Sequence, residues 1–212
     1  MEAHSLEVTR TARIYTLGTL TEKTENVWIV LHGYAMLAQY FIQKFDQLDP
    51  EKNFIIAPEG LSRLYQNGLN GRIGASWMTA EDRLNEIKDY TLYLDKVYQT
   101  YVEPHTNNRK IIGLGFSQGV STLLRWLNSK QYNFHHIIAW AGSIPNDVLE
   151  NYSLWNNTVQ IYYGTEDPLL SKEQVVDYLK NLDNHQIPYQ VIEYQGGHTL
   201  IKEEIKNLIN TK

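Results

Sequence analysis

The sequence predicts an α/β fold in which helices cover both faces of a mostly parallel sheet. Short apolar runs alternate along the chain with longer segments of helical periodicity, which is typical of β-α units. The apolar runs carry few interspersed polar residues, as expected for strands covered on both faces. A chain of 212 residues is long enough for one substantial core and short for two. We therefore expect residues 1–212 to form a single domain.

The order of the expected elements follows from these patterns. The expected core strands are Val27–Leu31, Asn53–Ala57, Lys110–Leu114, Ile137–Trp140, Val159–Tyr163 and Tyr189–Tyr194. The expected helices are Tyr40–Leu48, Glu81–Val102, Val120–Leu127, Lys172–Leu182 and Thr199–Ile209. The opening stretch Leu6–Leu17 alternates more and is expected to supply one or two edge strands. The glycine-containing stretch Glu59–Ala80 is expected to be a long loop, either functional or a plain surface excursion.

Composition and charge exclude several classes of function. The net charge is -5 and the 19 Lys and Arg residues are spread along the chain, so we expect no nucleic-acid partner. The chain has no cysteine, which excludes thiolate catalysis and disulfides. The segment Met1–Glu7 lacks the features of a secretory signal, and the longest apolar runs are far too short to span a bilayer. We expect a cytoplasmic, soluble protein with no stable membrane insertion.

The run Gly115-Phe116-Ser117-Gln118-Gly119 is the main candidate for chemistry. It follows an expected strand and precedes an expected helix, which is the setting of a nucleophile elbow. The flanking glycines remove side chains that would collide with the strand and the helix. The helix also directs its N-terminus at the serine, where negative charge is favoured. Ser117 is therefore predicted to be a nucleophile, and the alternative is an inert serine in a glycine-rich turn.

Two later residues complete a catalytic triad in the chain order Ser, acid, His. Asp167 follows an expected strand in a Gly-x-x-Asp turn, and Pro168 prevents that strand from continuing. It is preferred to Glu166, although an Asp that only satisfies its own turn is the alternative. His198 lies between the last strand and the last helix, where a loop can bring it to Ser117. We predict that Asp167 orients His198 and that His198 is the base.

An oxyanion hole is predicted from the segment Leu31-His32-Gly33-Tyr34, which follows an early strand. In such sites the loop after this strand donates one backbone N–H, and the residue after the nucleophile donates the other. We assign these donors to Tyr34, with Ala35 as the alternative, and to Gln118. Gly33 lets the backbone turn close to the substrate. His32 is expected to hold the loop and is assigned no proton transfer.

These motifs resemble the phospholipase/carboxylesterase family of α/β-hydrolases, which includes the acyl-protein thioesterases. The resemblance rests on the Leu31–Gly33, Gly115–Gly119, Gly164–Asp167 and Gly197-His198 segments and spans nearly the whole chain. It implies a sheet of about seven strands and hydrolysis of carboxylic esters or thioesters without a metal or organic cofactor. Fewer than twenty residues separate the Ile137 and Val159 strands, so no cap domain is expected there. Trp77-Met78-Thr79 stands where many members have Trp-Phe-Asp.

The predicted function is that of a serine hydrolase that cleaves a small-molecule ester or thioester through an acyl-enzyme. The aromatic side chains of Trp77 and Phe116 are assigned to the substrate pocket, with an apolar acyl or aryl group as the preferred ligand. Two alternatives stay open. The same triad could serve an amidase, a peptidase or a lactonase, or the fold could be a ligand-binding module with little or no catalysis.

Overall fold

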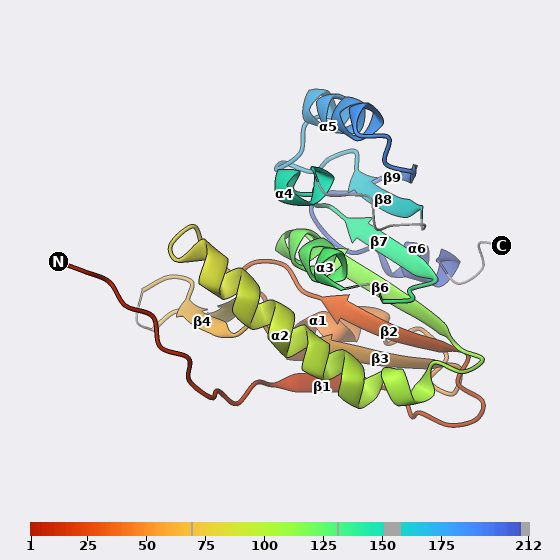
Figure 1. Ribbon diagram of the computed structural model, residues 1–212. Coiled ribbons are helices and arrows are strands. Elements are labelled where there is room, and N and C mark those ends of the chain that lie inside the picture. Colours follow the sequence, from red (N-terminus) through yellow and green to blue (C-terminus); the bar gives the residue numbers. More distant parts are fainter. Residues whose placement is uncertain (69, 131, 151–157, 209–212) are drawn as a thin grey trace.

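A seven-stranded sheet forms the centre of the computed structural model, which describes residues 1–68, 70–130, 132–150 and 158–208. Its strands, in spatial order, are β1 Ile14–Leu17, β3 Asn53–Pro58, β2 Asn26–Leu31, β6 Lys110–Phe116, β7 His136–Trp140, β8 Val159–Gly164 and β9 Tyr189–Tyr194. Strand β1 pairs antiparallel with β3, and all the other pairings are parallel. The carboxyl ends of β2, β6, β8 and β9 therefore lie along one edge of the sheet (Figure 1).

Helices cover both faces of this sheet (Figure 1). The helical elements are α1 Ala38–Phe41, the 3-10 turns η1 Ile42–Phe45 and η2 Glu103–His105, α2 Arg83–Tyr101, α3 Gln118–Ser129, α4 Asn146–Leu149, α5 Lys172–Asn184 and α6 Lys202–Asn207. Buried residues of α2, α3, α4 and α5 share one core cluster with the sheet. Those of α1, η1 and α6 share a second cluster on the opposite face. The predicted α/β architecture is confirmed.

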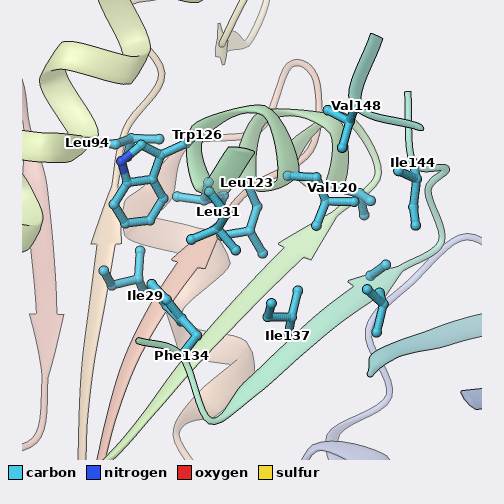
Figure 2. Close-up of a cluster of buried hydrophobic side chains, with 14 of the residues drawn as sticks. Ile29, Leu31, Leu94, Val120, Leu123, Trp126, Phe134, Ile137, Ile144 and Val148 are labelled. Atoms are coloured by element: carbon cyan, nitrogen blue, oxygen red, sulfur yellow. The ribbon is translucent and has the colours of Figure 1, made fainter. Parts of the chain in front are cut away.

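The larger of the two clusters shows how helix α3 is fixed. Val120, Leu123 and Trp126 recur at helical spacing and point toward the sheet, where they meet Ile29 and Ile137 (Figure 2). All five side chains are almost completely excluded from water. Burial of such side chains contributes about 2 kcal/mol each to folding. The packing holds the start of α3, and with it Ser117, at the end of β6.

The sequence patterns located the core strands, but several expectations differ from the structure. Within Leu6–Leu17 only Ile14–Leu17 forms a strand. The expected helix Tyr40–Leu48 is divided into the short α1 and a 3-10 turn. The expected terminal helix Thr199–Ile209 begins later, at Lys202, and Ile209 lies outside the described residues.

The stretch Glu59–Ala80 was expected to be a loop, and this was wrong for its middle part. It contains an antiparallel hairpin of β4 Ser62–Tyr65 and β5 Ile73–Ser76. A side chain at Gly74 would come within 2.4 Å of the carbonyl oxygen of Ala35, so the hairpin packs closely on the loop after β2. Two four-residue strands joined by a glycine-rich turn are too short to show a clear periodicity.

The connection from β7 to β8 spans residues 141–158, which is too short for a cap domain. Its described part holds α4, which the sequence patterns did not predict. Across the described residues, no helix combines the length and the apolar character that crossing a membrane requires.

Candidate active site

Ser117 occupies a sharp turn between β6 and α3. Its backbone has φ 53° and ψ -117°, a conformation that non-glycine residues rarely adopt. The turn is fixed on both sides, because the N–H of Ser117 donates to the carbonyl of Trp140 at 2.8 Å and the N–H of Val120 donates to the carbonyl of Ser117 at 3.0 Å. The side chain is therefore presented at the carboxyl edge of the sheet on a strained, well-anchored backbone.

The two glycines that flank this turn are required by close backbone contacts. A Cβ at Gly115 would lie 2.4 Å from the carbonyl oxygen of Gly119. A Cβ at Gly119 would lie 2.1 Å from the carbonyl oxygen of Leu31, at the end of β2. Both distances are far below van der Waals contact, so strand, helix and the neighbouring strand meet here only because both side chains are absent. This is the steric role that the sequence motif predicts.

Asp167 and His198 are brought into direct contact from the loops after β8 and β9. The Nδ1 atom of His198 lies 2.7 Å from Oδ2 of Asp167, whose other oxygen accepts the backbone N–H of Leu169 at 2.8 Å. The Asp167 side chain is completely buried and the His198 side chain is 21% exposed. An Nδ1–H that donates to a carboxylate leaves Nε2 as the accepting nitrogen of a neutral imidazole.

The loops that carry this pair are bonded to each other. The N–H of Glu166 donates to the carbonyl of Gly196 at 2.9 Å, and the N–H of Thr165 donates to that of Tyr194 at 3.0 Å. A Cβ at Gly164 would lie 2.2 Å from the oxygen of Gly196, so the loops approach as closely as glycine allows. The acid and the imidazole are thus held by backbone contacts as well as by their own hydrogen bond.

His198 also lies next to the Ser117 turn. Its ring centroid is 5.1 Å from that of Phe116, the residue before Ser117. Among the contacts of the described residues, no hydrogen bond joins the Ser117 hydroxyl to His198. Catalytic hydrogen bonds of this kind often become short only when substrate is bound. The structure therefore brings Asp167 and His198 together and places the imidazole of His198 beside the Ser117 turn.

The loop after β2 is held by a buried, neutral histidine. His32 is completely buried; its Nε2 accepts the N–H of Gly60 at 2.9 Å, so its Nδ1 carries the proton and donates to the carbonyl of Gly33 at 2.7 Å. Burial lowers the pKa of His32, although the bond to Gly33 and the nearby Glu59 oppose this shift. His32 therefore holds the loop, as expected. A Cβ at Gly33 would lie 3.2 Å from Cβ of Ser117, which places this loop against the serine.

Backbone N–H groups at this junction lack hydrogen-bond acceptors within the described residues. Those of Tyr34 and of Ala35, the alternative donor, donate no hydrogen bond there, and the same is true of Gln118, since the first N–H groups of a helix have no intrahelical partner. Ala35 has φ 59° and makes the turn after Tyr34. The Gln118 side chain accepts the N–H of Trp77 at 3.1 Å and donates to the carbonyl of Met78 at 2.7 Å. This contact ties the start of α3 to the end of the hairpin segment.

Comparison with known proteins identifies the relationship that this geometry suggests. A family model described as Phospholipase/Carboxylesterase matches residues 18–211. The chain belongs to the phospholipase/carboxylesterase family. Membership of this family supports a hydrolase of the esterase type. No curated protein matches the sequence.

Solved structures share the fold of this family member. The crystal structure of esterase PE8 has a TM-score of 0.68 at 20% identity and covers 95% of this chain and 97% of its own. That of Zea mays acyl-protein thioesterase 2 has a TM-score of 0.66 at 14% identity, covering 94% and 97%. That of a phospholipase/carboxylesterase from Dyadobacter fermentans has a TM-score of 0.65 at 22% identity, covering 97% and 98%. At these identities the likeness concerns the fold.

The two aromatic residues assigned to the pocket have different positions in this family member. Trp77 is 1% exposed, its indole N–H donates to the carbonyl of His32 at 2.8 Å, and its ring centroid is 5.0 Å from that of His32. It packs behind the loop instead of facing solvent, which is at odds with the expectation that it lines the substrate pocket. Phe116 is also buried, between Phe41 and His198, and borders the site through its contact with the imidazole.

Other features of the site were missed in the sequence. A Cβ at Gly142, just after β7, would lie 2.5 Å from the carbonyl oxygen of Ser117. Gly60 supplies the N–H that His32 accepts. Each glycine follows a strand of the parallel sheet, which is the only signal that pointed to them. Among the described residues no group of three or more His, Asp or Glu side chains could hold a metal ion.

Proposed function

We propose that this family member hydrolyses carboxylic esters or thioesters of small molecules through Ser117, His198 and Asp167. The observation that carries the proposal is the 2.7 Å contact between His198 Nδ1 and Asp167, with the imidazole beside the strained Ser117 turn. A buried carboxylate that fixes the tautomer of an imidazole next to a serine is the arrangement that activates a hydroxyl.

Each residue has one role in the proposed reaction. His198 Nε2 takes the proton of Ser117 as its oxygen attacks the carbonyl carbon. Asp167 keeps Nδ1 protonated and stabilises the imidazolium that forms. The N–H groups of Tyr34 and Gln118 bind the oxyanion, each contributing about 3 kcal/mol to the transition state. His198 then protonates the leaving oxygen or sulfur, and water repeats these steps on the acyl-enzyme.

Covalent labelling tests the nucleophile. A fluorophosphonate probe is expected to modify the protein at one serine, and Ser117→Ala is expected to lose both labelling and turnover of p-nitrophenyl acetate. Ser121→Ala is the matched control, because it removes a hydroxyl one turn further along α3, where the O–H donates to the carbonyl of Gln118 at 3.0 Å. Absence of any adduct on the wild-type protein would favour a ligand-binding module. Labelling without hydrolysis of esters or thioesters would favour an amide or lactone substrate.

A further inference from the structure

A groove with two arginines opens beside the proposed oxyanion hole. It has a volume of about 870 Å³ and lies between the loop after β2, Gln66 and Gly71–Ile73 of the hairpin, and the residue before β1. Side chains that matter to its chemistry are Arg13, Met36, Tyr40, Gln66, Arg72 and Ile73. We call it the arginine groove.

The arginine groove begins next to Ser117. A Cβ at Gly33 would lie 3.2 Å from Sδ of Met36, which lines the groove, and also 3.2 Å from Cβ of Ser117. One backbone position thus separates the wall of the groove from the serine. The hairpin wall is fixed to the same loop, because the side-chain amide of Gln66 donates to the carbonyl of Ala35 at 2.6 Å.

The strand order indicates which part of a substrate the groove receives. Asp167 and His198 follow β8 and β9, on one side of β6 in the sheet. The groove is built by residues that follow β2 and β3, on the other side of β6. Because His198 protonates the leaving group, the leaving group lies on the imidazole side. The acyl part then extends from Ser117 into the arginine groove.

The charge of the groove is the opposite of the charge of the protein. The chain carries a net charge of -5, yet the described residues that line the groove include two arginines and no acidic residue. Arg13 lies 3.4 Å from the buried Glu59, which also pairs with Arg63 at 3.0 Å. No ion pair of the described residues involves Arg72, whose side chain is exposed. The Glu59 carboxylate is shared between Arg13 and Arg63 and does not pair with Arg72, so the groove carries net positive charge.

The walls between the serine and Arg72 are partly apolar. Met36 borders the serine end, and Tyr40 and Ile73 expose 62% and 47% of their surface. Such walls suit a chain of methylene groups, while a guanidinium binds a carboxylate through two parallel hydrogen bonds. A neutral acyl chain would form no such pair with the exposed Arg72, whose guanidinium would stay hydrated.

We propose that the arginine groove selects acyl groups that end in a carboxylate, so that the substrates are monoesters or monothioesters of dicarboxylic acids. This rests on the proposed function. The reaction breaks the bond between the acyl carbon and the leaving oxygen or sulfur, and water supplies the new oxygen. The products are a free dicarboxylate and an alcohol or thiol. Arg72 is the specificity residue, and Arg13 supports the positive field beside it.

The test compares matched substrates with and without a charged terminal carboxylate. Mono-p-nitrophenyl esters of succinate, adipate and suberate are assayed beside the same compounds with the free carboxylate capped as a methyl ester. For the best chain length, the wild-type protein is expected to favour the free carboxylate by about tenfold in kcat/KM, the effect of one charge-assisted hydrogen-bonded pair. Added salt is expected to reduce the preference, because the groove is open to water.

Substitutions of Arg72 test whether the groove causes the preference for a free carboxylate. Arg72→Ala is expected to remove most of the preference, Arg72→Glu to reverse it, and Arg72→Lys to keep part of it. Lys96→Ala removes one positive charge from the exposed face of α2, away from the groove, and is expected to keep the wild-type ratio. Lys96→Ala is also expected to hydrolyse the capped esters at the wild-type rate, and for each Arg72 variant the readout is its ratio of kcat/KM for the free ester to that for the capped ester.

The outcomes separate this inference from the proposed function. If Ser117→Ala abolishes hydrolysis but the wild-type protein shows no preference for the free carboxylate, the selection by Arg72 is wrong and the esterase proposal stands. Selection by Arg72 is equally wrong if the preference survives in Arg72→Glu. If neither capped nor free esters are hydrolysed, the proposed function fails. A preference that is present in wild type and lost in Arg72→Ala supports the inference.

Discussion

Replacement of His32 tests how the loop beside Ser117 is held. The completely buried imidazole accepts the N–H of Gly60 at 2.9 Å and donates to the carbonyl of Gly33 at 2.7 Å. His32→Ala leaves two buried polar groups without these partners, at about 1–3 kcal/mol each, and opens a cavity. We expect the free energy of unfolding to fall by about 4 kcal/mol.

Two matched variants separate the two hydrogen bonds. The side-chain oxygen of His32→Gln can accept the N–H of Gly60, and the side-chain amide of His32→Asn can donate to the carbonyl of Gly33. Each variant is expected to recover about 1 kcal/mol of the loss in His32→Ala. Urea denaturation at about pH 8, where histidine is neutral in both states, measures these differences, provided that the m-values agree.

The pH dependence of stability gives an independent signature of His32. Burial lowers its pKa below the ordinary value of 6.5, so the unfolded chain binds a proton more readily than the folded chain. The contribution of His32 is therefore complete above pH 6.5 and is lost as the pH falls below it, by at most about 1.4 kcal/mol per pH unit. Below pH 6.5 the unfolding free energy of the wild-type protein is therefore expected to fall more steeply with pH than that of His32→Gln, by this amount. Two results would refute a buried neutral imidazole. One is an equal dependence of the unfolding free energy on acid pH in wild type and His32→Gln, and the other is a loss of stability under about 1 kcal/mol in His32→Ala.

Three further perturbations test the site and its support. Asp167→Asn is expected to lower kcat for p-nitrophenyl acetate by about 10⁴-fold, because an amide does not fix the tautomer of His198. Its circular dichroism spectrum is expected to stay unchanged, and full activity would contradict the role assigned to Asp167. Gly119→Ala places a Cβ 2.1 Å from the oxygen of Leu31 and is expected to cost several kcal/mol of stability and most of the activity, which thermal unfolding and turnover measure together. Asp95→Ala removes the carboxylate that accepts a buried indole N–H at 2.9 Å and is expected to cost about 3 kcal/mol by urea denaturation; an unchanged midpoint would contradict this.

The core of the fold was predictable because it depends on runs of residues that are close in sequence. Strands that the structure buries on both faces, such as β2 and β6, consist mostly of consecutive apolar residues. Helix α3 shows its apolar face at regular spacing. The hairpin β4–β5 was missed because contacts with a distant loop stabilise it, and four-residue strands leave too little pattern to detect.

The candidate site was predictable to the extent that chain order and turn chemistry determine it. Gly115 and Gly119 were identified because a sharp turn between strand and helix excludes side chains. The burial of Trp77 was not predictable, since an aromatic residue in a loop packs inward or outward according to neighbours from other strands. Arg72 carried no signal in the sequence, because its place in the groove with Met36 depends on how the hairpin folds back on the loop after β2.

The hairpin is tied to the rest of the site by its backbone and presents two side chains that take no part in those contacts. At the base, Gly60 bonds to His32 and Trp77 bonds to Gln118, both of which support the Ser117 turn. At the tip, Arg72 and Ile73 form a wall of the groove and no part of that support. Exchange of the Arg72 and Ile73 side chains is therefore expected to alter substrate choice, while the contacts of Gln66 and Gly74 with Ala35 keep the loop beside Ser117 in place.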